Sequence, residues 1–154
     1  GDIIVIDEGR ILQSGSAKEV FENPSNAKVA EITNDPAMNI NKGSIENGNL
    51  ILNQDIKFPL PTHLKHIPSG KYLVGIRATD LHLDEQGFNF DVDISEISGS
   101  ETFLHLHNNE VKCVATIEEV RTYEVNDRVK LNFDLSKIYL FKESGELQHS
   151  PYKN

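Results

Sequence analysis

The sequence predicts a mainly β protein: a small antiparallel barrel or sandwich, preceded by a β-hairpin and a short two-helix connector. Short extended stretches, several of them alternating between apolar and polar residues, recur from about residue 40 onward. Gly, Asn and Pro punctuate these stretches, and no long helical pattern lies between them, which is typical of all-β domains. With 154 residues, the chain has room for one full domain or for a small domain with a flanking piece.

The first expected element is the hairpin. Residues 3–6 are an unbroken apolar run, and residues 11–13 resume an extended pattern after a polar turn. Gly9 can adopt the positive φ that such a turn requires. A strand that is apolar at every position is expected to be covered on both faces. The sequence therefore predicts that residues 3–6 need neighbours from elsewhere.

A two-helix connector is expected over residues 16–33. Ser16 and Glu19 have the spacing of a capping box, and Pro24 stops the helix that they begin. Asn26, or the serine before it, can cap a second short helix.

The expected β domain begins with a hairpin around Asn47-Gly48, a strong turn signal. The Pro-rich stretch 58–70 predicts a loop. Further strands are predicted within residues 71–77, 87–97, 102–107, 111–116, 125–134 and 137–141, of which residues 125–134 begin with a turn and residues 137–141 should be the final strand.

Alternation along these strands predicts the core, because residues two apart share one face of a strand. The residues expected to face inward are Phe88, Phe90, Val92, Ile94, Leu104, Leu106, Val129, Leu131 and Phe133.

Composition argues against several functions. The chain has 24 acidic and 15 basic residues and a net charge of −9, whereas a nucleic-acid surface needs a basic stripe. The same charge disfavours direct docking on anionic lipid. No stretch reaches the apolar length of a membrane span, so no direct membrane insertion is expected. The single cysteine excludes an internal disulfide and suits the cytosol.

Catalytic motifs are absent from the sequence: it contains no P-loop, nucleophile elbow or zinc-protease helix motif. His105 and His107, two apart on one strand face, could hold a metal, but a solvated strand face is the favoured interpretation. Cys113 lies between valines and is expected to be a buried, inert thiol. Asp91 and Asp93 are interpreted as a polar strand face rather than an acid–base pair. The residues alone therefore predict a noncatalytic β module.

Five stretches, taken in order, carry a resemblance to a known family. They are residues 2–32, 35–39 ("DPAMN"), 74–81 ("VGIRATDL"), 96–106 ("EISGSETFLHL") and 138–147 ("IYLFKESGEL"). In this order the chain resembles the C-terminal part of the ATP-binding subunit of sugar-type ABC importers, the group of the maltose-transporter ATPase. Each stretch is short and common alone, and the whole order is far more specific.

The resemblance implies two parts. Residues 1–36 would be the end of the nucleotide-binding domain, and residues 37–154 a transporter-associated OB-type (TOBE) accessory domain. The neighbours of the first strand would then lie upstream, with the P-loop and the other ATPase motifs. The motif residues that the resemblance assigns to a regulatory surface are Gly75, Ile76, Arg77, Asp80, Ser98, Gly99, Ser100 and Glu101. Residues 75–77 and 98–101 are expected to lie close together, with Arg77 paired with Glu101 or Asp80.

The resemblance also implies a function: a noncatalytic regulatory and dimerisation domain of a transport ATPase. No catalytic residue, metal or cofactor is expected in this chain, and ATP and magnesium are expected only in the full-length protein. The implied partners are a second copy, the ATPase domain and the transmembrane permease subunits, at the inner face of the plasma membrane. The alternatives are a β module that binds a small oxyanion such as molybdate, which the net charge of −9 disfavours, and an enzyme with an unrecognised site.

Overall fold

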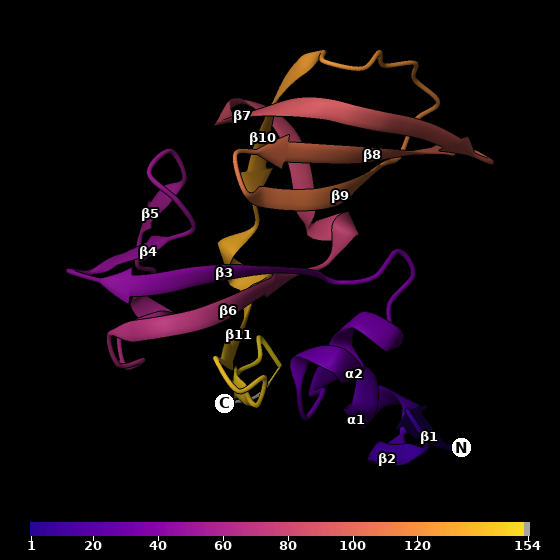
Figure 1. Ribbon diagram of the computed structural model, residues 1–154, viewed down its shortest axis with the longest axis vertical. Coiled ribbons are helices and arrows are strands. Elements are labelled where there is room, and N and C mark those ends of the chain that lie inside the picture. Colours follow the sequence, from indigo (N-terminus) through magenta and orange to yellow (C-terminus); the bar gives the residue numbers. More distant parts are fainter. Residues whose placement is uncertain (153–154) are drawn as a thin grey trace.

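A computed structural model, described here for residues 1–152, confirms the mainly antiparallel β class (Figure 1). The helices are α1 (Ala17–Glu22) and α2 (Ala27–Ile32). The strands are β1 (Asp2–Asp7), β2 (Arg10–Ser16), β3 (Asn39–Glu46), β4 (Asn49–Ile51), β5 (Lys57–Pro59), β6 (Gly70–Ile76), β7 (Leu81–Ser98), β8 (Glu101–Asn108), β9 (Val111–Ile117), β10 (Arg128–Phe133), β11 (Tyr139–Lys142) and β12 (Leu147–His149).

The strands form three sheets, with the orders β1-β2, β10-β7-β8-β9 and β12-β11-β6-β3-β4-β5. The four-stranded sheet lies over the six-stranded sheet, and the hairpin and helices lie beside them at one end (Figure 1). A closed barrel is not formed within residues 1–152, which corrects that part of the expectation. The barrel stays open at β9, the edge strand of the four-stranded sheet, because side chains of β3 form hydrogen bonds with it in place of a paired strand.

Two asparagines of β3 bind the free edge of β9. The Asn39 amide accepts from the Val114 N–H at 2.7 Å and donates to the Val114 carbonyl at 3.0 Å. Asn41 makes the same pair of bonds with Lys112, at 3.1 and 2.8 Å. Each amide reproduces the donor and acceptor of a peptide group, so the two sheets are joined without a continuous backbone ladder.

The main core fills the space between the two larger sheets. Of the residues predicted to face inward, Phe90, Val92, Leu104, Leu106, Leu131 and Phe133 are buried, and Phe88 and Val129 pack against them half-buried. Ile94 was predicted wrongly, since 55% of it is exposed. The pairing of β7 with β8 shifts between Val92 and Ile94, and a one-residue bulge moves the following side chains to the opposite face.

Strand β7 also makes a larger excursion. Its pairing with β10 jumps from Asn89 to Leu83, so residues 84–88 are looped out of the ladder. Gly87 makes this possible, because a Cβ there would lie 2.6 Å from the backbone of Leu131. The excursion forms one wall of a cleft described below.

The hairpin and both helices form where the sequence predicts them, and the hairpin strands, Asp2–Asp7 and Arg10–Ser16, are longer than expected. Gly9 has a φ of +75°, as the turn requires. The Ser16 hydroxyl accepts from the Glu19 N–H at 3.1 Å, and the Asn26 amide oxygen accepts from the Val29 N–H at 3.0 Å. These bonds satisfy N–H groups that the first turn of a helix leaves free.

Two strands lie where none was expected. The edge strand β5 falls in the Pro-rich stretch, and it turns Phe58 into the core. After β11 the chain does not turn away: β12 pairs back with β11. This final segment also reaches the helices, because the Gly145 carbonyl accepts from the Ala27 N–H at 2.8 Å and Leu147 N–H donates to Ser25 at 3.0 Å.

Candidate functional site

The motif residues Gly75 and Arg77 lie where the helices meet the six-stranded sheet. Arg77 follows the end of β6 and is 8% exposed. Its Nε donates to Asn34 Oδ1 at 2.9 Å, and its Nη2 donates to the Phe21 carbonyl at 2.7 Å. Since Phe21 belongs to α1 and Asn34 follows α2, one guanidinium holds both helices to the sheet. We call this cluster the Arg77 junction.

Aromatic rings enclose the Arg77 side chain. Its guanidinium carbon lies 3.9 Å from the centroid of the Phe21 ring and 4.9 Å from that of Tyr139. The Tyr139 hydroxyl and the Ser150 hydroxyl both donate to the Glu22 carbonyl, at 2.9 and 2.8 Å. The last carbonyls of α1 thus find donors in the β domain, where a cation also suits the negative end of the helix.

The charge of Arg77 is stabilised by carbonyl oxygens and rings. Within residues 1–152 no carboxylate lies within 4.0 Å of its nitrogens, so the expected ion pair with Asp80 or Glu101 is not formed. Partial burial raises the pKa of Asp80, and the positive charge of Arg77 opposes that rise. Burial likewise raises the pKa of Tyr139 and keeps its hydroxyl a donor.

Gly75 leaves room for residues from two of the family stretches, 35–39 and 138–147, to pack against β6. A Cβ at Gly75 would lie 2.8 Å from the Met38 sulfur and 3.0 Å from the Phe141 ring. Met38 and Phe141 form a second apolar cluster with Tyr139 and with two alanines of α2, on the face of the six-stranded sheet away from the main core. Ile76, the residue between Gly75 and Arg77, is buried in the main core.

The other motif residues lie apart from this junction. Ser98, Gly99 and Ser100 are exposed at the turn between β7 and β8, and Glu101 is half-buried beside them. This turn stands at the projecting end of the four-stranded sheet (Figure 1). The structure therefore divides the predicted site residues between a buried junction and an exposed turn.

The two histidines of β8 form surface pairs with carboxylates. His105 lies 2.7 Å from Glu96, and His107 lies 2.6 Å from Asp93 and 3.8 Å from Asp91. Asp91 also lies 3.3 Å from Arg128. These contacts fit the polar strand face that the sequence predicts.

Cys113 is buried, and burial raises the pKa of its thiol to about 12. A thiol in this state has almost no thiolate at neutral pH, which agrees with the inert role expected from the sequence.

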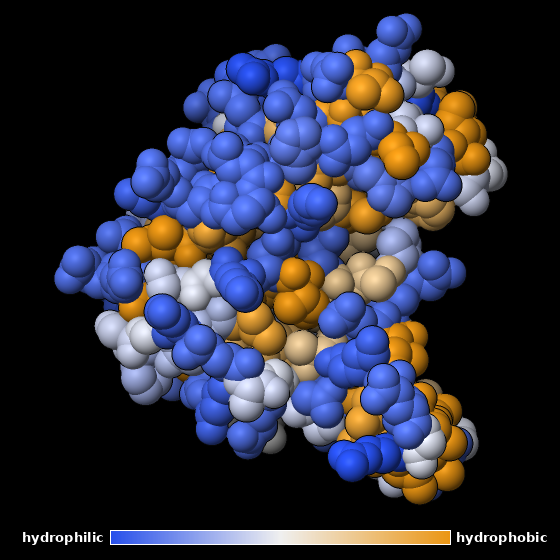
Figure 2. Space-filling model, viewed as in Figure 1, coloured by the Kyte–Doolittle hydropathy of each residue, from blue (hydrophilic) through white to orange (hydrophobic). Residues whose placement is uncertain are grey.

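The hairpin of β1 and β2 has one covered and one open face. Val5 is buried in a small cluster with Val20 and Val29 of the helices. The opposite face, which we call the hairpin face, carries Ile4, Ile6 and Ile11, which are exposed by 59%, 58% and 66%. Figure 2 shows apolar surface gathered over this hairpin. The sequence predicts that this strand is covered on both faces, and in the structure other residues cover one of them.

Sequence reasoning found Arg77 but not its partners. Asn34, Phe21 and Tyr139 lie 43, 56 and 62 positions away along the chain, and their pairing depends on the fold. Phe21 and Tyr139 lie in stretches that carry the family resemblance, but Asn34 lies between two such stretches and had no signal of its own.

Comparison with known proteins identifies the class: the relatives of this chain are ATP-binding proteins of ABC transporters. The E. coli protein YcjV, an uncharacterized ABC transporter ATP-binding protein, is 27% identical over 94% of this chain. The oligosaccharides import ATP-binding protein MsmX of Bacillus subtilis is 25% identical over 95% of it. The sn-glycerol-3-phosphate import ATP-binding protein UgpC of Jannaschia is 36% identical over 68% of it. The resemblance inferred from the sequence is therefore confirmed.

The chain spans less than half of these relatives: its matched residues cover 42% of YcjV, 44% of MsmX and 30% of UgpC. No family model matches the chain. Within residues 1–152, no helix has the length and apolar character needed to cross a membrane.

Proposed function

We propose that this chain is the noncatalytic regulatory and dimerisation part of the ATP-binding subunit of a sugar importer. Residues 1–36 would belong to the end of the nucleotide-binding domain, and residues 37–154 would form the accessory domain. The relatives support this proposal, since the names of two of them specify import of oligosaccharides or of sn-glycerol-3-phosphate. In such a protein the chain would work in the cytoplasm, beside membrane-embedded permease subunits.

The Arg77 junction is the observation that carries the proposal. A regulatory domain must transmit its state to the part that hydrolyses ATP, and packed side chains and hydrogen bonds between the two parts can carry that coupling. Buried hydrogen bonds from Arg77 to the ends of both helices provide one, at 2.7 and 2.9 Å. Movement of the β domain would therefore move the helices with it.

The hairpin face supports the dimerisation part of the proposal. Burying an isoleucine side chain stabilises a protein by about 1.5–3 kcal/mol, and Ile4, Ile6 and Ile11 are all more than half exposed. The two-stranded sheet of the hairpin also has open edges, which readily pair with another strand. For this chain we propose that a second copy covers the hairpin face.

Variants of the hairpin test the surface that this proposal names. Ile4→Lys with Ile6→Lys should weaken self-association at least about tenfold. Each substitution replaces an apolar side chain that the second copy would cover with a charged one. Ile32→Lys is the matched control: Ile32 is 46% exposed on α2 and lies outside the hairpin face. Equal weakening by the control, or no weakening by the double variant, would contradict the assignment of this surface.

Calorimetry tests the noncatalytic part. Phosphoryl transfer depends on groups that position phosphate and magnesium, and the sequence has no P-loop. We expect no heat of binding with Mg-ATP. Binding of ATP in the micromolar range would contradict the proposal, and binding of molybdate or tungstate would favour the oxyanion alternative.

A further inference from the structure

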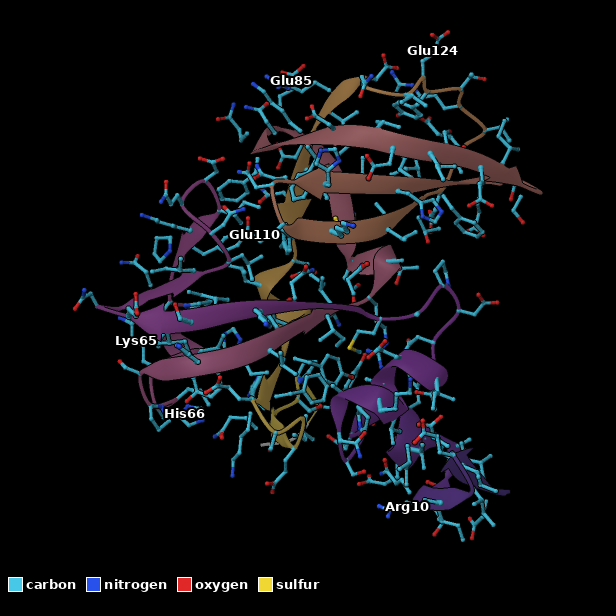
Figure 3. All side chains as sticks on the ribbon, viewed as in Figure 1. Arg10, Lys65, His66, Glu85, Glu110 and Glu124 are labelled. Atoms are coloured by element: carbon cyan, nitrogen blue, oxygen red, sulfur yellow. The ribbon has the colours of Figure 1, made fainter. Side chains whose placement is uncertain are left out.

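A polar cleft lies between the β4–β5 loop and the four-stranded sheet, and none of the residues that line it belongs to the Arg77 junction. Its volume is about 640 Å³, within the range of small-molecule sites. The looped-out segment of β7 forms one wall, and the turn between β8 and β9 forms another. Figure 3 shows this turn, marked by Glu110, facing the β4–β5 hairpin.

The amide groups at this cleft are held in place by one another. Asn108 Oδ1 accepts from Asn53 at 3.0 Å and from Asn109 at 3.1 Å, and Asn108 Nδ2 donates to the Asn89 carbonyl at 2.8 Å. Asn109 Nδ2 also donates to Asp55 at 3.1 Å. Such a network fixes side chains before a ligand arrives, which lowers the entropy cost of binding.

The charges at the cleft nearly balance. Asp91 lies 3.3 Å from Arg128 and 3.8 Å from His107, so the one arginine of the cleft is already paired. Asp55 adds a further carboxylate. A bare anion would meet two carboxylates and a neutralised arginine, so the cleft favours a neutral ligand with both donors and acceptors.

An apolar aromatic ring also lines the cleft. Phe88 is half-buried and is fixed edge-to-face against Phe58, with 5.0 Å between the ring centroids. A ring held beside amides and carboxylates offers an apolar surface for C–H groups next to partners for hydroxyl groups. We propose that this cleft binds a neutral, polyhydroxylated small molecule of the carbohydrate class. The proposal does not depend on the function proposed above.

Titration of the isotope-labelled chain with maltose and with glucose, followed by amide NMR shifts, tests the proposal. We expect saturable shifts confined to residues 53–55, 87–91 and 107–109, with affinity in the millimolar range. Sulfate, titrated separately at matched ionic strength, should leave these residues unchanged.

Paired variants locate the site. Gln54 and Asn89 line the cleft with exposed amides. Gln54→Ala with Asn89→Ala should weaken sugar binding at least about tenfold, as expected for the loss of one or two hydrogen bonds. Gln86→Ala, an exposed amide in the same excursion of β7 but outside the cleft lining, should change affinity less than twofold.

The proposal would be overturned by no saturable shift with either sugar, by shifts that lie outside the cleft, or by a response to sulfate alone. Retained binding in the double variant would do the same. A one-dimensional spectrum of each variant checks that it is folded, so that a loss of binding can be assigned to the cleft.

Discussion

Removing the Arg77 side chain should loosen the helices from the β domain. Arg77→Met keeps much of the side-chain volume but removes the hydrogen bonds to Asn34 and to the Phe21 carbonyl, at 2.9 and 2.7 Å. Hydrogen bonds from a charged group contribute about 1.5–3 kcal/mol each. Contact with the Phe21 ring at 3.9 Å adds about 0.5–2 kcal/mol.

An opposing effect reduces the total. Burying the Arg77 guanidinium costs free energy because the charged group loses its hydration on folding. Methionine is apolar and does not have this cost, so the substitution recovers part of the stability that it removes. We therefore expect a net loss of about 2–4 kcal/mol in the free energy of unfolding. For a chain of 154 residues, this corresponds to a fall in Tm of about 5–15 °C.

Thermal denaturation and amide hydrogen exchange measure the effect. Exchange should accelerate most in α1 and α2, while β8 and β9 remain protected. Arg121→Met is the control, because Arg121 is an exposed arginine that pairs with Glu119 at 3.3 Å and should contribute less than about 1 kcal/mol. A loss below about 1 kcal/mol for Arg77→Met, or uniform acceleration across both sheets, would refute the role given to the junction.

Three further predictions concern the β domain. Asn39→Asp removes the donor to the Val114 carbonyl and places a carboxylate next to that carbonyl. The free energy of unfolding, measured with urea, should fall by about 1–3 kcal/mol. An unchanged midpoint would mean that the hydrogen bonds between Asn39 and Val114 do not stabilise the fold. Leu106→Ala should cost about 2–5 kcal/mol because Leu106 is 1% exposed, whereas Ile94→Ala should cost less than about 1 kcal/mol; the reverse order would mean that the bulge in β7 is misplaced. Burial, and then the charges of His63 and His66, lower the pKa of His149 below its ordinary value of 6.5. As the pH falls, His149 is therefore protonated in the unfolded chain before it is protonated in the folded protein, and the free energy of unfolding should decrease below pH 6.5. His149→Gln should reduce this dependence of stability on pH, and an unchanged dependence would contradict the prediction.

Local signals predicted much of the fold. Gly9 and the Asn47-Gly48 pair set their turns, while Ser16 and Asn26 cap their helices as expected. Each of these features depends on residues within four positions of one another. Alternation likewise identified both inward-facing leucines of β8.

Features that depend on distant segments were not predicted. The bulge that exposes Ile94 follows from how β7 meets β8, and no residue type near it marks the irregularity. The bond from Asn39 to Val114 joins residues 75 positions apart. Strand β5 has only three residues, and its proline is tolerated because it lies on an edge strand.

In the candidate site, too, local motifs were predicted and contacts between distant segments were not. The family stretches indicated Gly75 and Arg77, but the expected partners Asp80 and Glu101 were wrong. The Phe21 carbonyl and the Asn34 side-chain oxygen are the partners instead, and a backbone carbonyl has no sequence signature.

Sedimentation velocity of the unmodified chain, over a hundredfold range of concentration with and without Mg-ATP, tests the central claim most directly. A noncatalytic dimerisation domain should show a reversible monomer–dimer equilibrium that ATP leaves unchanged. A chain without residues 1–15 should shift that equilibrium toward monomer. A monomer at every concentration, or a dimer that forms only with ATP, would contradict the account.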